Sequence, residues 1–257
     1  MHFGREIVIG IRNLLIPFSG VMATFRGCGG WQRFQGTYYS LRLSLQWVQE
    51  DFFHLIELTM KALLLIDIQN DFLPGGALAV TDGDQVIPVA NRLMSQFPLV
   101  VATQDWHPRN HRSFASQHPG RNVGEVISLN GVNQVLWPDH CVQGSIGAQL
   151  APELNLEVID HVVQKGTDVL IDSYSGFFDN DHRKSTGLDQ LLRDQSVTEV
   201  QLVGLATDYC VKFTALDAVS LGFKTSVVIE GIRGVELSPG DCARAIDEML
   251  SAGIEII

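Results

Sequence analysis

The sequence predicts an α/β protein with a mostly parallel β-sheet that helices cover on both faces. Two observations lead to this fold class. From Met60 onward, short continuous apolar segments alternate with longer amphipathic segments, and apolar strands separated by helices are typical of parallel sheets that are buried on both faces. The chain has 257 residues, 46% of them hydrophobic, which is enough to bury a core of this kind.

The strands and helices can be placed in order along the chain. We expect strands at residues 61–66, 98–103, 161–165, 199–205 and 224–229. Apolar residues at helical spacing predict helices near residues 84–96, 187–195, 208–221 and 239–252. Ligands of such sheets bind beyond the carboxyl ends of the strands, so the residues that follow each strand are the candidates for a functional site.

Residues 1–59 differ from the rest of the chain. They hold ten of the 21 aromatic residues and carry a formal charge of +1, from five arginines and four acidic residues. Within them only the segment from Leu41 to Leu58 looks organised, since apolar residues from Leu41 to Leu55 fall near one helical face, which predicts a docked amphipathic helix. We therefore expect an N-terminal extension at residues 1–59 and one domain at residues 60–257.

Charge and cysteine content narrow the class of partner. The net charge of −11 at pH 7 argues against nucleic acid and anionic membranes, because binding their phosphates requires a concentrated basic surface. No run of eighteen apolar residues is present, so we expect no transmembrane helix. Four cysteines without the spacing of a disulfide scaffold favour reduced thiols in a cytoplasmic protein. We expect a small-molecule substrate, with a second copy of the chain as a further potential partner.

Three reactive side chains follow different predicted strands. Asp67 comes after five apolar residues, so its carboxyl group should have a raised pKa unless a cation lies nearby. Lys165 could be that cation, and Cys210 lies in the first turn of a predicted helix, capped by Thr207 or Asp208, where the helix dipole favours a thiolate. Separately these could be a turn-capping acid, a solvated lysine and a small buried hydrophobe. Together they favour nucleophilic catalysis, with Asp67 as the base.

A second cluster has the composition of a metal site. Asp105 and His107 are separated by one residue, so in an extended segment they point to the same side, and His140 could complete a three-ligand site. Such a set suits zinc, iron or manganese. His111 and Ser113 could supply a further ligand directly or through water, although we expect His111 to be solvated. The pattern of an Asp and a His two residues apart is common, so this cluster alone is a moderate signal.

Five segments of the chain resemble nicotinamidases (pyrazinamidases) of the isochorismatase-like cysteine hydrolase superfamily. They are LLLIDIQNDF, QDWHPRNHRSFASQHPG, LWPDHCVQGSIGAQL, KGTDVLIDSYSGFFDN and VGLATDYCVKFTALDA, in the order and at the spacing of the family. The resemblance starts at Met60 and does not extend to residues 1–59. Because family members commonly begin near the first strand, one explanation for the extension is an assigned start codon upstream of the true one.

The resemblance implies a three-layer α/β/α fold and the hydrolysis of nicotinamide to nicotinate and ammonia in NAD salvage, together with hydrolysis of pyrazinamide. It implies that Asp67, Lys165 and Cys210 form the catalytic triad. The implied ligands of one divalent metal ion, zinc first and iron or manganese as alternatives, are Asp105, His107 and His140.

The resemblance also implies the walls and the oxyanion-binding loop of the site. The residues that match the nicotinamide pocket are Phe72, Trp137 and Tyr174. A cis peptide is implied between Leu205 and Ala206, and the backbone N–H groups of Ala206 and Cys210 would hold the oxyanion. Some members have a further metal ligand where this chain has Ser113, so we expect a water-mediated contact there.

Two alternatives to a nicotinamidase remain open at the level of the sequence. One is a related hydrolase that acts on a carbamoyl or ureido compound or on isochorismate, which the Asp-His-His set disfavours because many such relatives lack it. The other is a catalytically silent member that binds a nicotinamide-like ligand or a protein partner. The complete set of reactive residues argues against this second alternative.

Overall fold

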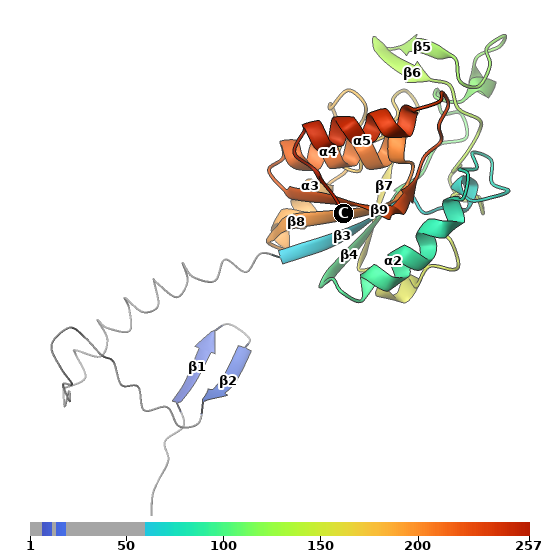
Figure 1. Cartoon of the computed structure of the whole chain (residues 1–257). Coiled ribbons are helices and arrows are strands. Elements are labelled where there is room, and N and C mark those ends of the chain that lie inside the picture. The colour runs from blue at the N-terminus through green and yellow to red at the C-terminus, as the bar shows by residue number, and fades with distance from the viewer. Residues whose placement is uncertain (1–6, 12–13, 19–59) are drawn as a thin grey trace, which may run out of the picture. The chain divides into compact units, whose positions relative to one another are not determined.

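A computed structural model describes residues 7–11, 14–18 and 60–257 (Figure 1). The chain divides into two units, residues 1–57 and residues 58–257. In the first, the backbone of β1 (Ile7–Ile11) pairs antiparallel with that of β2 (Leu14–Phe18), a hairpin that the sequence analysis did not predict. The helix predicted within residues 41–58 lies outside the described residues.

The second unit contains a six-stranded parallel sheet. Its strands in spatial order are β10 (Glu255–Ile256), β9 (Lys224–Arg233), β8 (Val197–Leu205), β3 (Met60–Ile66), β4 (Leu99–Asp105) and β7 (His161–Lys165). Every neighbouring pair is parallel, and all five predicted strands are present. The predicted fold class is therefore confirmed.

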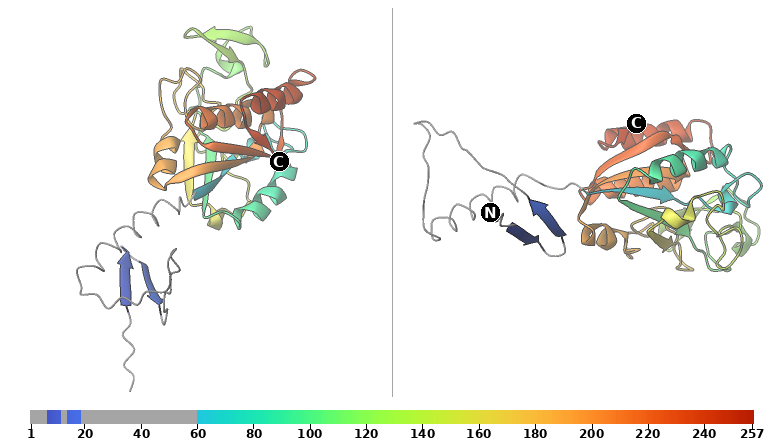
Figure 2. Two further views of the ribbon diagram at one scale, coloured as in Figure 1. Left: turned by 60° about the vertical axis from the view of Figure 1, so that its left-hand side comes forward. Right: turned by 90° about the horizontal axis from the view of Figure 1, so that it is seen from below.

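Helices cover both faces of this sheet (Figure 1, Figure 2). In β3, Ala62, Leu64 and Ile66 belong to the core on one face, whereas Leu63 and Leu65 belong to the core on the other, because successive side chains of a strand alternate. The first core is shared with α3 (Leu188–Asp194), α4 (Lys212–Ser220) and α5 (Asp241–Ser251), and the second with α2 (Val86–Met94). These four helices match the four that the sequence predicts.

Several short elements that the sequence analysis did not predict lie outside the six-stranded sheet. A hairpin arm, β5 (Val126–Leu129) and β6 (Val132–Val135), extends from the second unit (Figure 1). The described residues also form four 3-10 helices, η1 (Asn70–Phe72), η2 (Gly83–Gln85), η3 (Ala115–Gln117) and η4 (Leu156–Val158).

The helix after β8 begins differently from the prediction. A turn of π-helix, η5 (Thr207–Val211), precedes α4, and Ala206 stands at its N-cap. The prediction that Thr207 or Asp208 caps this helix is wrong. The carboxylate of Asp208 instead accepts hydrogen bonds from the backbone N–H groups of Val235, at 2.9 Å, and Glu236, at 2.8 Å.

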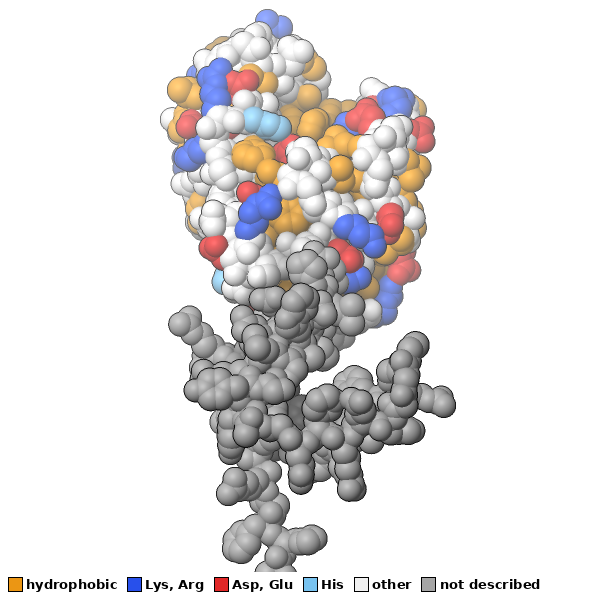
Figure 3. Space-filling model, turned by 90° about the vertical axis from the view of Figure 1, so that its left-hand side faces the viewer, with side chains coloured by type: hydrophobic (Ala, Val, Ile, Leu, Met, Phe, Trp, Pro, Cys, Tyr) orange, Lys and Arg blue, Asp and Glu red, His pale blue; other side chains and the backbone are white. Residues whose placement is uncertain are grey.

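Charges of both signs are interspersed on the face that carries the amino end of β3 (Figure 3). Within the described part of the chain, no helix is long and apolar enough to cross a membrane.

Gly204 provides a test of how β3 and β8 fit together. A Cβ atom at Gly204, where φ is +129°, would lie 2.1 Å from the carbonyl oxygen of Ile66 on the neighbouring strand. Gly204→Ala should therefore separate the two central strands and lower the free energy of unfolding by about 2 kcal/mol or more, measured by chemical denaturation. Gly222→Ala is the matched control, since Gly222 also has a positive φ, +89°, but has open space around it. Equal losses in the two variants would contradict a steric cause.

Candidate active site

The carboxyl ends of four strands bring the predicted reactive residues together. Asp67 follows β3, Asp105 ends β4, Lys165 ends β7, and Cys210 lies in η5 after β8. The Nζ atom of Lys165 lies 2.9 Å from Asp67 Oδ2 and 2.5 Å from Asp105 Oδ1. One carboxylate oxygen of each aspartate and the sulfur of Cys210 lie within 4.8 Å of one another. Residues far apart in the sequence thus form one buried cluster.

The hydrogen bonds of Lys165 determine which oxygen of Asp67 stays free. Nζ donates to Asp105 Oδ1 at 2.5 Å, to the carbonyl oxygen of Ser173 at 2.8 Å and to Cys210 Sγ at 3.4 Å. These three bonds use all three protons of an ammonium group. Asp67 Oδ2 is consequently an ionic neighbour of Lys165 with no hydrogen-bond partner of its own. The sequence predicted the pairing of Lys165 with Asp67, but not the contact with Asp105.

Burial and charge pairing set the protonation of these groups. Burial raises the pKa of Asp67, as expected for a poorly solvated acid, and Lys165 opposes this shift. Burial alone would lower the pKa of Lys165, but Asp105, Asp67 and Cys210 together raise it well above the usual value. For Asp105, burial is outweighed by Lys165 and the neighbouring histidines, and the pKa is lowered. Lys165 and Asp105 therefore form a charged pair inside the protein.

The thiol of Cys210 is neutral in this environment. Its side chain belongs to the core, and burial raises its pKa well above the usual value, although Lys165 acts in the opposite direction. The sequence analysis expected the helix N-terminus to favour a thiolate at Cys210, whereas burial shifts the pKa of this thiol in the opposite direction. A buried neutral thiol needs a nearby base before it can act as a nucleophile. The free oxygen of Asp67 is suited to this role.

The loop before Cys210 has the backbone that the resemblance implies. The peptide bond between Leu205 and Ala206 is cis. Ala206 lines the same cavity as Cys210.

Asp105, His107 and His140 direct their ligand atoms at one point. Oδ2 of Asp105 lies 3.6 Å from Nε2 of His107 and 3.8 Å from Nε2 of His140. The Nδ1 atoms are occupied by backbone carbonyl oxygens, of Gly166 at 2.9 Å and of Pro138 at 2.8 Å. These bonds place the Nδ1 protons and leave both Nε2 lone pairs for a metal ion.

The environment of these three groups also fits a metal site. All three side chains are buried, and Nε2 of His107 has no hydrogen-bond partner. Burial and the neighbouring His107 lower the pKa of His140 to about 4, so His140 is neutral. A carboxylate and two imidazoles suit zinc, iron or manganese.

The surroundings of the metal-ligand set differ in part from the prediction. His111, which we expected to be solvated, is completely buried, and its Nδ1 lies 2.7 Å from Oγ of Ser113. Asp172 was missed: its Oδ1 lies 4.0 Å from Nε2 of His107, and it forms a second potential ligand group with His107 and His111. The only available signal was its place in the matched segment KGTDVLIDSYSGFFDN, because Asp172 follows no predicted strand.

A cavity with aromatic walls adjoins the cluster. Its lining includes the three residues expected from the resemblance, Phe72, Trp137 and Tyr174, together with Asp105, His140 and Cys210. Trp137 Nε1 donates a hydrogen bond to the Tyr174 hydroxyl at 3.2 Å, which fixes two of these walls relative to each other. The lining residues that sequence reasoning missed are Leu78, Asp172, Tyr209 and Val235.

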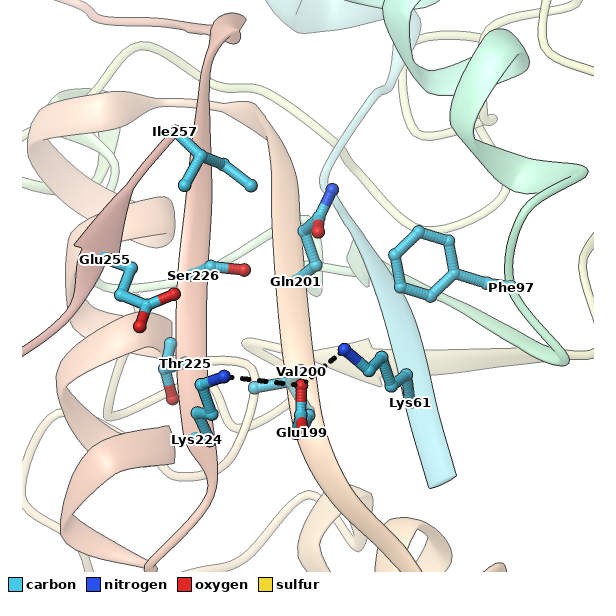
Figure 4. A pocket seen from close by; sticks show the side chains of 10 residues that line it. All are labelled: Lys61, Phe97, Glu199, Val200, Gln201, Lys224, Thr225, Ser226, Glu255 and Ile257. Carbon is cyan, nitrogen blue, oxygen red and sulfur yellow. Dashed lines mark ion pairs between the residues drawn. The ribbon is translucent and has the colours of Figure 1, made fainter. Parts of the chain in front are cut away.

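A larger cavity of about 180 Å³ lies at the opposite, amino end of the strands (Figure 4). Lys61 and Glu199 form an ion pair of 2.7 Å in its wall. None of the reactive residues borders it, so the cavity beside Cys210 is the candidate active site.

Comparison with known proteins identifies the family. The model of the isochorismatase domain matches residues 61–257. The chain belongs to the isochorismatase family. Among members of this family, it is 54% identical over 197 residues to the nicotinamidase of Escherichia coli K12, a match that covers 75% of this chain and 92% of that protein.

Solved structures agree with this assignment. An Acinetobacter baumanii nicotinamidase and pyrazinamidase superposes with a TM-score of 0.76 at 45% identity, covering 79% of this chain and 97% of the other. A Pyrococcus horikoshii pyrazinamidase in complex with zinc superposes with a TM-score of 0.63 at 37% identity, covering 77% and 98% of the two chains.

Gly166 tests the metal-ligand geometry. A Cβ atom at Gly166, where φ is +63°, would lie 2.4 Å from Cε1 of His107. Gly166→Ala should therefore displace the imidazole and weaken zinc binding by about 10-fold to 100-fold, measured by competition with a metallochromic chelator. Gly187→Ala is the control, since Gly187 has φ of +95° and open space around it. Unchanged zinc affinity in Gly166→Ala would show that His107 is not a ligand.

Proposed function

We propose that this chain is a nicotinamidase, a metal-dependent cysteine hydrolase that converts nicotinamide and water into nicotinate and ammonia in NAD salvage, and that it also hydrolyses pyrazinamide. The observation that carries the proposal is the position of the Cys210 thiol, which lines the cavity and lies next to a base, an ammonium group and a metal-donor set. The nicotinamidase of E. coli, at 54% identity, supports the choice of substrate.

The first half of the reaction forms a thioester. Asp67 Oδ2 accepts the proton of the Cys210 thiol, and the sulfur attacks the carboxamide carbon of nicotinamide. Lys165, 3.4 Å from the sulfur, stabilises its negative charge. The backbone N–H groups of Ala206 and Cys210 hold the negative charge that develops on the carboxamide oxygen.

The second half releases both products. Asp67 returns the proton to the nitrogen as the carbon–nitrogen bond breaks, and ammonia leaves. Water then attacks the thioester carbon, with Asp67 as the base, and nicotinate leaves as the thiol is restored. Since Lys165 keeps its proton throughout, it acts as a fixed positive charge and not as an acid.

Substrate orientation depends on the metal-ligand set and on the aromatic walls. Asp105, His107 and His140 would hold one divalent ion, with zinc the first choice because the P. horikoshii pyrazinamidase is a zinc complex, and iron or manganese as alternatives. When bound, this ion supplies a Lewis acid for the pyridine nitrogen. Phe72, Trp137 and Tyr174 enclose the flat ring and keep the carboxamide facing Cys210.

The nucleophile is tested by its removal. Cys210→Ala should lower kcat for ammonia release from nicotinamide by about 10³-fold or more, while thermal unfolding and zinc content stay close to those of the parent protein. Cys242→Ala is the matched control, because this partly exposed cysteine lies outside the cavity, and should retain activity. Substantial turnover by Cys210→Ala would refute the assigned nucleophile. Comparison of nicotinamide with pyrazinamide and a carbamoyl amide determines the substrate class.

Metal dependence is tested independently. Chelation should lower kcat for nicotinamide at least about tenfold, since a ring without its Lewis acid is less well oriented, and added Zn²⁺, Fe²⁺ or Mn²⁺ should restore it. His140→Ala should give the same loss without chelation, whereas His161→Ala, at an exposed position of β7, should not. Full activity of protein that elemental analysis finds metal-free would contradict the proposal.

A further inference from the structure

We propose that Thr103 is a positioning residue that presents one chosen oxygen of Asp67 to the thiol of Cys210. This inference rests on the proposed function, in which Asp67 is the base. Thr103 lies on β4, two residues before its carboxyl end, and is completely buried. Thr103 does not line the cavity beside Cys210, and its hydroxyl is hydrogen bonded to Asp67, so we expect its effect on the site to pass through Asp67.

The Thr103 hydroxyl makes two hydrogen bonds to Asp67. The backbone N–H of Asp67 donates to Oγ1 at 3.1 Å, and Oγ1 donates to the side-chain atom Oδ1 at 2.7 Å. A backbone N–H can only donate, so the hydroxyl accepts that bond, and an ionised carboxylate can only accept, so the hydroxyl donates its own hydrogen to Oδ1. The direction of both bonds is therefore determined without reference to any other residue.

The hydroxyl thus holds Asp67 at two places at once. Asp67 has φ of +45°, in the left-handed region that residues other than glycine rarely adopt. Thr103 gives its buried N–H group an acceptor in this conformation and ties its carboxylate to the same atom. Both the turn after β3 and the rotation of the side chain depend on one oxygen.

The remaining oxygen of Asp67 is the one that can accept a proton. Oδ1 is occupied by Thr103, and the three protons of Lys165 go to Asp105, Ser173 and Cys210. Oδ2 has no hydrogen-bond partner. In the transfer that Thr103 prepares, the S–H bond of Cys210 breaks, an O–H bond forms at Oδ2, and the electron pair stays on sulfur.

A second pair of hydrogen bonds links the ends of β3 and β4, and here the side chain comes from the β3 end and the backbone from β4. Gln69, after β3, donates through Nε2 to the carbonyl oxygen of Asp105 at 2.9 Å, and its Oε1 accepts from the N–H of Asp105 at 2.8 Å. Gln69 therefore fixes the end of β4, and Thr103 fixes the start of the turn after β3. Without the Thr103 hydroxyl, Asp67 could rotate although the strands remain in register.

Three substitutions distinguish the effect of the Thr103 hydroxyl from the effect of the volume of its side chain. Thr103→Val keeps the shape and deletes the hydroxyl, Thr103→Ala deletes the hydroxyl and the methyl group, and Thr103→Ser keeps only the hydroxyl. If Thr103 positions Asp67, Thr103→Val and Thr103→Ala should each lower kcat for nicotinamide about 10-fold to 100-fold, as expected for a misplaced catalytic group. KM should stay within about threefold of the parent value because the cavity walls are intact. Thr103→Ser should keep at least about a third of the activity of the parent protein. If Thr103 only packs, kcat should follow the reverse order: Thr103→Val should be close to the parent protein, and Thr103→Ser should be close to Thr103→Ala.

Controls keep the test decisive if a variant is unstable. Thr225→Val is the matched control, because Thr225 is a buried strand threonine, hydrogen bonded to the carbonyl oxygen of Phe223, at the amino end of β9. Its kcat should not change. Thermal unfolding is measured for each variant, and if Thr103→Val does not fold, the comparison of Ala with Ser still decides the question.

Alkylation of Cys210 by iodoacetamide, followed by mass spectrometry, gives a readout that does not need the substrate. The rate of alkylation should fall in Thr103→Val and Thr103→Ala and be retained in Thr103→Ser. If the parent protein does not hydrolyse nicotinamide, the proposed function fails, but the order of the alkylation rates still judges the role of Thr103. The inference would be overturned if the parent protein, Thr103→Val and Thr103→Ser had equal alkylation rates and equal kcat values.

Discussion

The buried ammonium group of Lys165 is the interaction on which the site depends. An unpaired charge at this depth would cost several kcal/mol, yet Lys165 is held by Asp67 and Asp105, both buried. The pairing is unequal, because two carboxylates surround one ammonium, and Asp172 adds a third acid near His107. Excess negative charge of this kind is what a divalent cation offsets. Asp105 belongs both to the ion-pair cluster and to the metal-ligand set, so a cation bound by the set would offset the negative charge of both.

Parallel topology explains why so much of this site could be predicted from the sequence. The carboxyl ends of parallel strands meet at one edge, so Asp67, Lys165 and Cys210 had to approach one another once the strands were placed correctly. Residues held by irregular loops do not follow from this rule. Asp172 is the clearest case, since no strand or helix precedes it directly and only its tertiary contacts place it beside His107.

Two expectations about the start of the helix after β8 are opposed by the surrounding fold. Asp208 has the residue type and position of a helix cap, but its carboxylate is used by two backbone N–H groups of the loop after β9. Cys210 has the position at which a helix N-terminus favours a thiolate, but its burial raises the pKa of the thiol. Both rules describe an isolated helix end. Here the fold supplies competing hydrogen bonds in one case and removes water in the other.

The reactive atoms are oriented mainly by groups that never touch a substrate. Backbone carbonyl oxygens of Gly166 and Pro138 orient the two histidines, and Gln69 holds the backbone of Asp105 on both sides. Such bonds are directional, whereas apolar packing alone leaves a side chain several rotamers of similar energy. A buried polar group is also costly to leave unpaired, so each of these bonds resists reorientation. The precision of the site is thus a property of the strand ends and their loops, and the apolar cores on the two faces of the sheet contribute by keeping those strand ends in place.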